Sequence, residues 1–140
     1  MKRAILIIML LLPLYSIAQD KNLQILQEAI DGRDPASITE LDLSYNGLTS
    51  LPSEIGKLKN LTRLDLSYND LTSLPSEIGQ LKNLTELYLH NNYLTSLPPE
   101  IGQLQNLTEL RLYDNELPEA ERQKIESWLP NCEIIWENPY

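Results

Sequence analysis

Three consecutive segments of the chain repeat one sequence: ITELDLSYNGLTSLPSEIGKLKN (residues 38–60), LTRLDLSYNDLTSLPSEIGQLKN (61–83) and LTELYLHNNYLTSLPPEIGQLQN (84–106). A fourth, partial copy covers residues 107–117 and then departs from the pattern. The offset between copies is 23 residues. A constant period of this length indicates a supersecondary unit that stacks on copies of itself, because no single copy can bury its own apolar face. The repeat therefore predicts a solenoid.

Each copy contains a Leu-x-Leu pair with the periodicity of a β-strand. Both leucines of a pair face the interior, and the residue between them faces the opposite side. The backbone of so short a strand needs hydrogen-bond partners, which the next copy can supply. The pairs predict a parallel sheet with one strand per copy: Leu41 and Leu43, Leu64 and Leu66, Leu87 and Leu89, Leu110 and Leu112. The Pro- and Gly-containing segments that follow predict an irregular or 3₁₀ return path.

One asparagine follows each predicted strand at the same phase of the repeat: Asn46, Asn69, Asn92 and Asn115. These amides could contact a ligand, or they could form a structural ladder that bonds backbone groups left open by the bend. We favour the ladder, because an identical residue in every copy serves the stack and not one site.

The full pattern, LxxLxLxxNxLxxLPxxIGxLxN, resembles the leucine-rich repeat family in its short bacterial form. The resemblance covers residues 38–117. It implies an α/β fold: a short right-handed solenoid with a parallel β-sheet on its concave face, closed by N- and C-terminal caps. It also implies a function in protein–protein contacts.

The flanking segments predict the two caps. Residues 19–37 form the N-terminal cap, with a helix that Asp20 caps and Gly32 ends. Residues 118–140 form the C-terminal cap, in which Pro118 opens a helix and the EIIW segment adds a last strand. We interpret the caps as the ends of a complete array. The inward helix positions are Leu23, Leu26, Ala29 and Ile30 in the first cap and Ile125, Trp128 and Leu129 in the second.

Residues 1–18 have the layout of a secretory signal peptide. Lys2 and Arg3 precede an apolar run over residues 4–14, and Ser16-Ile17-Ala18 offers small residues at a cleavage site after Ala18. A membrane anchor is the alternative, but the run is shorter than the ~20 residues that a span needs and contains Pro13. We therefore expect a secreted or periplasmic (cell-envelope) protein without stable membrane insertion after cleavage.

The processed chain would be strongly acidic. Removal of Lys2 and Arg3 leaves 9 basic residues against 20 acidic ones, a net charge of −11. Such a charge repels nucleic acid and anionic lipid, so we expect no nucleic-acid partner. It suits a cationic partner, and equally it suits simple solvation of the surface.

The sequence contains no recognisable catalytic or metal-binding motif. His90 and Cys132 are the only histidine and cysteine, and they lie far apart along the repeat. Asp42 and Asp65 occupy equivalent strand positions and could hold a cation, but we favour an exposed column whose charge Arg63 offsets. We expect Cys132 to be a buried cap residue, and we attribute the Asn-x-Thr triplets to the repeat, not to glycosylation. The sequence thus predicts no enzyme activity, no cofactor and no metal.

The positions that face away from the leucines vary from copy to copy, whereas the core positions barely change. These variable columns contain several tyrosines, a residue type enriched at binding hot spots. We predict ligand contacts there, mainly from Tyr88, His90, Arg111 and Tyr113, although β-propensity alone would also place tyrosine on strands. The candidate binding residues are Tyr45, Arg63, Tyr68, Glu86, Tyr88, His90, Glu109, Arg111 and Tyr113.

The sequence favours a non-catalytic interaction module that binds a protein or peptide of unknown identity on its concave face. The alternative is a structural surface protein that assembles with itself through its solenoid ends. We favour a monomer over a homo-oligomer.

Overall fold

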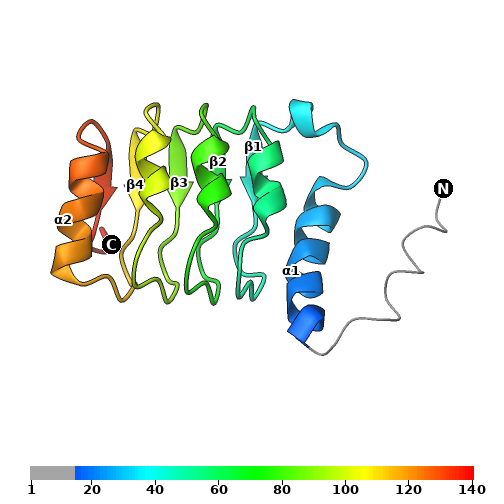
Figure 1. Cartoon of the computed structure of the whole chain (residues 1–140), viewed down its shortest axis with the longest axis horizontal. Helices are drawn as coiled ribbons and strands as arrows, with labels where there is room; N and C mark the ends of the chain where they lie inside the picture. The colour runs from blue at the N-terminus through cyan, green and yellow to red at the C-terminus, as the bar shows by residue number, and fades with distance from the viewer. Residues whose placement is uncertain (1–14) are drawn as a thin grey trace.

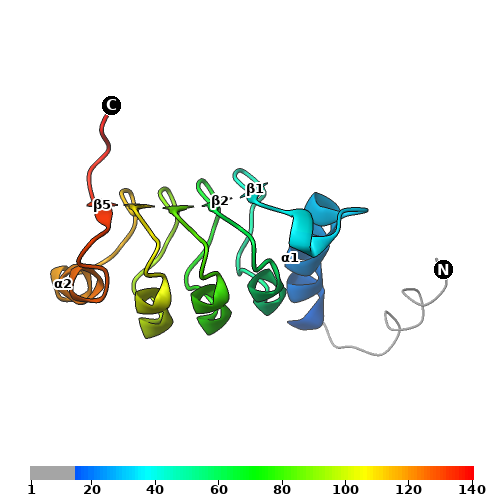
Figure 2. The same cartoon turned by 90° about the horizontal axis from the view of Figure 1, so that it is seen from above.

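The computed structural model describes residues 15–140. Stacked coils form a curved array, with strands on one side and short helices on the other (Figures 1 and 2). The predicted signal peptide, residues 1–18, lies for the most part outside the described residues. Within residues 15–140, no helix is both long and apolar enough to cross a membrane.

The strands form one parallel sheet in chain order, β1-β2-β3-β4-β5. Neighbouring strands pair without any shift in the repeat, so that Leu41 lies beside Leu64 and Leu64 beside Leu87. The α/β solenoid and its parallel sheet are therefore confirmed. Each strand has three residues: Glu40–Asp42, Arg63–Asp65, Glu86–Tyr88, Glu109–Arg111 and Glu133–Ile135.

The return path of each complete repeat contains a 3₁₀-helix. Each one follows an extended proline, which cannot donate to a strand ladder and so ends the pairing. The glycine in each helix allows the next coil to approach: a Cβ on Gly79 would lie 2.7 Å from the backbone oxygen of Glu100. These helices are η3 (Ser53–Lys57), η4 (Ser76–Gln80) and η5 (Pro99–Gln103), and a shorter 3₁₀-helix, η2 (Pro35–Ser37), precedes the first repeat.

The core is a continuous column of leucine and isoleucine between the strands and the 3₁₀-helices. Leu64, Leu66, Leu87 and Leu89 are completely buried, as the strand periodicity predicts. Each fully buried side chain of this size contributes about 1.5–3 kcal/mol through the hydrophobic effect. The same column continues from coil to coil, so stability depends on contact between neighbours.

The first cap is helix α1, Tyr15–Ile30. It begins before the predicted position, so Asp20 lies inside the helix and does not cap it. Gly32, with a φ of 70°, adopts the left-handed conformation that commonly follows a helix end. The buried amide of Asn22 donates to Thr49 Oγ1 (3.1 Å) and Ser50 Oγ (3.0 Å), which fastens α1 to the first coil.

The second cap consists of helix α2, Glu119–Trp128, and strand β5. Pro118 precedes α2 in an extended conformation and is not its first residue as expected. The inward helix face is confirmed, since Ile125 and Leu129 are buried. The predicted last strand is also confirmed, and β5 pairs with β4 through Leu110 and Ile134.

A ladder of buried asparagine side chains joins the bends. Asn69 Nδ2 donates to the carbonyls of Leu43 and Leu66, and its Oδ1 accepts from the backbone N–H of Leu48 (2.9 Å). Asn92 repeats this pattern one coil later. Asn46, at the open end of the ladder, is exposed, and its side chain donates to the backbone oxygen of Ser44 (3.0 Å). The ladder satisfies polar groups that the bend would otherwise bury without partners.

A second ladder explains the Asn-x-Thr triplets. The side chain of Asn83 donates to the backbone oxygen of Lys59 (3.0 Å), and the hydroxyl of Thr85 donates to that of Thr62 (2.9 Å). The equivalent bonds recur at the other two triplets. The asparagine and the threonine of each triplet are thus hydrogen-bonded to the preceding segment of the stack, which gives the pattern a structural reason.

The Asn ladder yields a stability prediction. Asn92→Ala should lower the free energy of unfolding by about 2–3 kcal/mol, because it leaves a buried N–H and two buried carbonyls without partners. Asn46→Ala is the matched control and should cost less than about 1 kcal/mol, because Asn46 is exposed and forms one local bond. Urea denaturation of both variants checks this. Equal losses in the two variants would contradict a ladder that works by burial.

Candidate binding face

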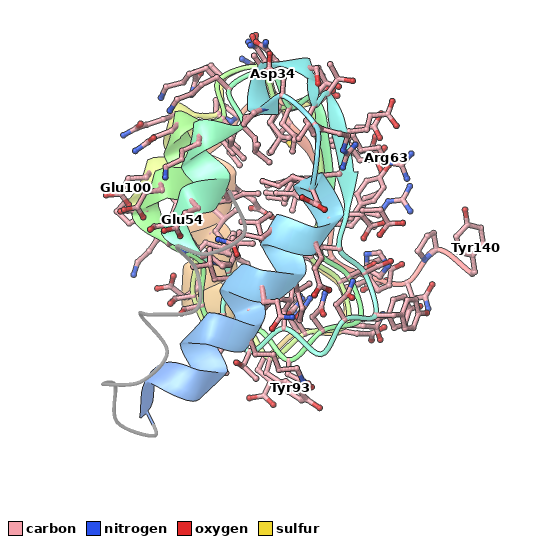
Figure 3. All side chains as sticks on the ribbon, turned by 90° about the vertical axis from the view of Figure 1, so that its right-hand side faces the viewer. Asp34, Glu54, Arg63, Tyr93, Glu100 and Tyr140 are labelled. Atoms are coloured by element: carbon pink, nitrogen blue, oxygen red, sulfur yellow. The ribbon has the colours of Figure 1, made fainter. Side chains whose placement is uncertain are left out.

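The middle residue of each repeat strand is a buried core leucine, and the first and third residues point to the outer, strand side of the solenoid. Figure 3 looks at the N-terminal end of the stack, with Arg63 of β2 on this side and Glu54 and Glu100 on the opposite, helical side. The side chains that alternate with the core leucines therefore form one face, as the strand periodicity predicts. We call it the sheet face.

Charged side chains of the sheet face form ion pairs across and along the strands. Arg63 Nε lies 3.7 Å from Glu86 Oε2, and Arg111 Nε lies 2.5 Å from Glu109 Oε1. Both guanidinium groups lie over the ring of Tyr88, at 5.1 and 4.3 Å from its centroid. Four predicted binding residues thus surround a fifth and are already engaged with one another.

Tyr88 is the centre of this arrangement. Its hydroxyl donates to Glu86 Oε2 at 2.8 Å. Burial raises the pKa of Tyr88 to about 12, and the hydrogen bond to Glu86 and the charge of Glu109 act in the same direction. Tyr88 therefore remains neutral at physiological pH and serves as a fixed platform for the two arginines.

A line of four rings runs along the edge of the sheet face, one ring from each repeat. Tyr45 stacks on Tyr68 with centroids 4.3 Å apart and planes 9° from parallel. Tyr68 meets His90 edge-on at 5.3 Å, and His90 stacks on Tyr113 at 4.5 Å. We call this set, Tyr45, Tyr68, His90 and Tyr113, the aromatic line.

The two halves of the aromatic line arise from different repeat positions. Tyr45 and Tyr68 occupy the bend position, where Asn91 and Asp114 stand in the later copies. All four bend residues have a positive φ, between 54° and 56°. This left-handed conformation costs a residue such as tyrosine roughly 1–2 kcal/mol, whereas asparagine and aspartate tolerate it. An aromatic pair returns only about 0.5–1.5 kcal/mol, so stacking of the first two rings adds little net stability.

The aromatic line is exposed at its N-terminal end and buried at the other. The exposed fraction is 72% for Tyr45 and 41% for Tyr68, but only 6% for His90 and 5% for Tyr113. Tyr88 is 7% exposed. Three of the four side chains that the sequence singled out as the main contacts are therefore nearly closed to solvent. The open aromatic surface lies at Tyr45 and Tyr68.

Comparison with known proteins identifies the family to which this architecture belongs. A family model described as a leucine-rich repeat region matches residues 38–126. The chain belongs to the leucine-rich repeat family. It is similar to the solved structure of a leucine-rich repeat protein of Leptospira interrogans, with 54% identity and a TM-score of 0.68. The similarity covers 69% of this chain but 25% of that one, so this chain matches about a quarter of that protein's length. No curated protein matches the sequence.

Two aspartates of the leucine-rich repeats have a role in the bend that the sequence analysis missed. Asp42 Oδ1 accepts from the backbone N–H of Ser44 (2.9 Å) and from its hydroxyl (2.6 Å), and Asp65 does the same with Ser67. The hydrogen bonds from Ser44 lower the pKa of Asp42. An Asp-x-Ser signal in both copies marks this local turn. Among residues 15–140, no group of three or more His, Cys, Asp or Glu side chains is placed to hold a metal ion.

Cys132 lies in the second cap and is partly exposed, not fully buried as expected. It packs against the edge of the core. Burial raises its pKa to about 11, and Glu109 and Glu133 add to the effect. The thiol is therefore protonated at neutral pH, which makes it a poor nucleophile.

His90 is the one side chain among residues 15–140 that has a buried polar atom, Nδ1, without a hydrogen-bond partner. Burial lowers the pKa of His90, and Arg111 acts in the same direction. Asp65 and Asp114 oppose the shift. The aromatic line thus contains a buried histidine whose pKa is lowered, which favours its neutral form.

The burial of His90 predicts how stability depends on pH. The free energy of unfolding should fall as the pH is lowered from about 7.5 to about 5.5, because the unfolded chain binds a proton near its usual pKa of about 6.5 while folded His90 resists protonation. The contribution is complete above the unfolded pKa and is lost as the pH falls towards the folded one. His90→Gln should flatten this slope in urea denaturation series. A slope that survives the substitution would assign it to other groups, since the chain has a single histidine.

Proposed function

We propose that this leucine-rich repeat chain is a non-catalytic interaction module of the cell envelope or the extracellular space, and that it binds a protein or peptide through its sheet face. The family suggests a protein-interaction module. Leucine-rich repeat proteins are typically non-catalytic, which supports the proposal of a binding module without enzyme activity.

The main support is the contrast between the two sides of each strand. The inward positions are leucine in every repeat, while the outward residue between the two leucines of each Leu-x-Leu pair is Asp42, Asp65, Tyr88 and Arg111 in turn. The stack requires the inward set and leaves the outward set free. A standard interface needs about 800 Å² on each partner, roughly a tenth of this chain's 8694 Å².

Cross-linking from opposite faces of one repeat tests the proposal. A photoreactive residue at Glu40, on the exposed side of β1, should form a covalent adduct with a partner protein in the producing cells. The same residue at Glu54, on the helical side of that repeat, should not. Both positions are glutamates of the first copy, and they lie on opposite sides of it, Glu40 on strand β1 and Glu54 in helix η3. Adducts are compared by gel mobility and mass spectrometry.

The pattern of adducts also separates the alternatives. An adduct from Glu54 alone, or equal adducts from both positions, would contradict a sheet-face interface. An adduct that contains two copies of this chain would favour the self-assembling surface protein, and sedimentation at micromolar concentration would then show an oligomer instead of the proposed monomer.

The localisation part of the proposal rests on residues 1–18. N-terminal sequencing of the protein after export should begin at Gln19, because the small residues of Ser16-Ile17-Ala18 suit signal peptidase. Ala18→Leu is the control and should block or displace cleavage. A chain recovered with Met1 intact in the membrane fraction would instead indicate an uncleaved anchor.

A further inference from the structure

The N-terminal end of the aromatic line is an unoccupied stacking surface. Tyr45 uses one ring face to stack on Tyr68, and no other ring or cation of residues 15–140 contacts its outer face. At the opposite end of the line, His90 and Tyr113 are stacked on each other and buried. The line is thus closed at one end and open at the other.

The open end cannot be attributed to folding alone. Tyr45 and Tyr68 hold a strained left-handed backbone in the position where the later copies use Asn91 and Asp114. In those later copies the ring comes from the preceding residue and is buried. The chain therefore keeps a ring in every repeat, and only in the first two does it leave that ring in solvent.

Negative charge outweighs positive charge on this half of the sheet face, where Glu40, Asp42 and Asp65 line one hollow with Arg63. Among the described residues, the ion pairs of the sheet face involve Glu86 and Glu109, and neither Asp42 nor Asp65 forms one. Asp65 lies close enough to raise the pKa of Tyr45, after the larger effects of desolvation and of Tyr68. An exposed tyrosine face beside an excess of carboxylate charge attracts a cation by both ring and charge.

The chain itself shows which cation fits such a surface. Arg111 lies over Tyr88 while its Nε bonds Glu109, and Arg122 lies over Trp136 at 5.2 Å. A guanidinium group is planar, so it can stack on a ring and still direct N–H groups at a carboxylate, which an ammonium group cannot do as well.

We propose that the outer face of Tyr45, together with Asp42 and Asp65, binds an arginine side chain of the partner and so extends the aromatic line by one planar group. This inference rests on the proposed function, because it names the chemistry of a partner on the same face. It makes an arginine-containing, basic segment the occupant of the N-terminal half of the sheet face.

Binding of a capped peptide, Gly-Arg-Gly-Arg-Gly, to the exported protein tests the proposal. Tyr45→Asn should weaken binding by about fivefold or more, because it removes the ring. Tyr45→Phe should change it by less than about twofold, because the ring face remains. Tyr93→Asn is the control: Tyr93 is exposed in another turn outside the line and should leave binding unchanged. Titration by calorimetry and by NMR of the tyrosine ring protons gives both affinity and location.

Variation of charge and shape isolates the guanidinium. The citrulline analogue keeps the shape without the charge and should lose binding, and the lysine analogue should bind about threefold more weakly. Asp42→Asn combined with Asp65→Asn should also weaken the arginine peptide, while the amide oxygens can still accept the bonds from Ser44 and Ser67. Tyr45→Asn should keep its Tm within about 3 °C, because relief of backbone strain offsets the lost stacking.

The proposed arginine site at Tyr45 is refuted if the wild-type protein does not bind the peptide, or if Tyr45→Asn and Tyr93→Asn bind it equally well. It is also wrong if Tyr45→Asn lowers affinity only by unfolding the protein. If the adduct at Glu40 forms to the same extent in the Tyr45→Asn variant, the arginine site is refuted and the proposed function is retained. Absence of any such adduct would instead refute the proposed function, whatever the peptide does.

Discussion

The whole structure depends on one constraint: each coil must satisfy the polar backbone and cover the apolar edge of the coil beside it. Asn69 and Asn92 show how closely the two requirements are joined, because each buried amide bonds carbonyls of its own coil and of the preceding one. A copy of the repeat alone would expose leucines and leave these bonds unmade. Stacking at a fixed offset of 23 residues is the arrangement that meets both requirements at once.

The same constraint divides the side chains into two classes. Inward leucines, bend asparagines and the close-packed glycines of the 3₁₀-helices cannot change without loss of contact between coils. Outward strand residues carry no such requirement, yet they are not independent of one another. Identical phase brings residues 23 apart in sequence into direct contact, as with Tyr45 and Tyr68 or His90 and Tyr113. A repeat therefore creates side-chain lines as readily on its surface as in its core.

How far the sequence predicts the structure follows from this division. The parallel arrangement of the strands and the burial of Leu64 and Leu87 follow from the 23-residue repeat and from the spacing of its leucines, both of which can be read from the sequence. The burial of Tyr88, His90 and Tyr113 depends on contacts between outward side chains. The sequence period shows that these side chains point outward, but it does not show how far their neighbours cover them. Asp20 shows another limit, because a good capping residue does not exclude further helical residues before it, and α1 begins at Tyr15.

The two halves of the sheet face use the same chemistry in opposite states. In the C-terminal half, Tyr88 has two guanidinium groups over its ring and glutamates that pair with them, so its attraction for cations is already satisfied within the chain. In the N-terminal half, Tyr45 has an open ring face, and the carboxylates of Glu40, Asp42 and Asp65 outnumber Arg63, which lines the same hollow. An incoming arginine would have to displace a guanidinium group of the chain at the ring of Tyr88, but not at the outer face of Tyr45. The asymmetry has two causes in the sequence. The third and fourth copies place the ring one residue earlier, and they have Tyr88 and Arg111 at the strand position where the first two copies have aspartate.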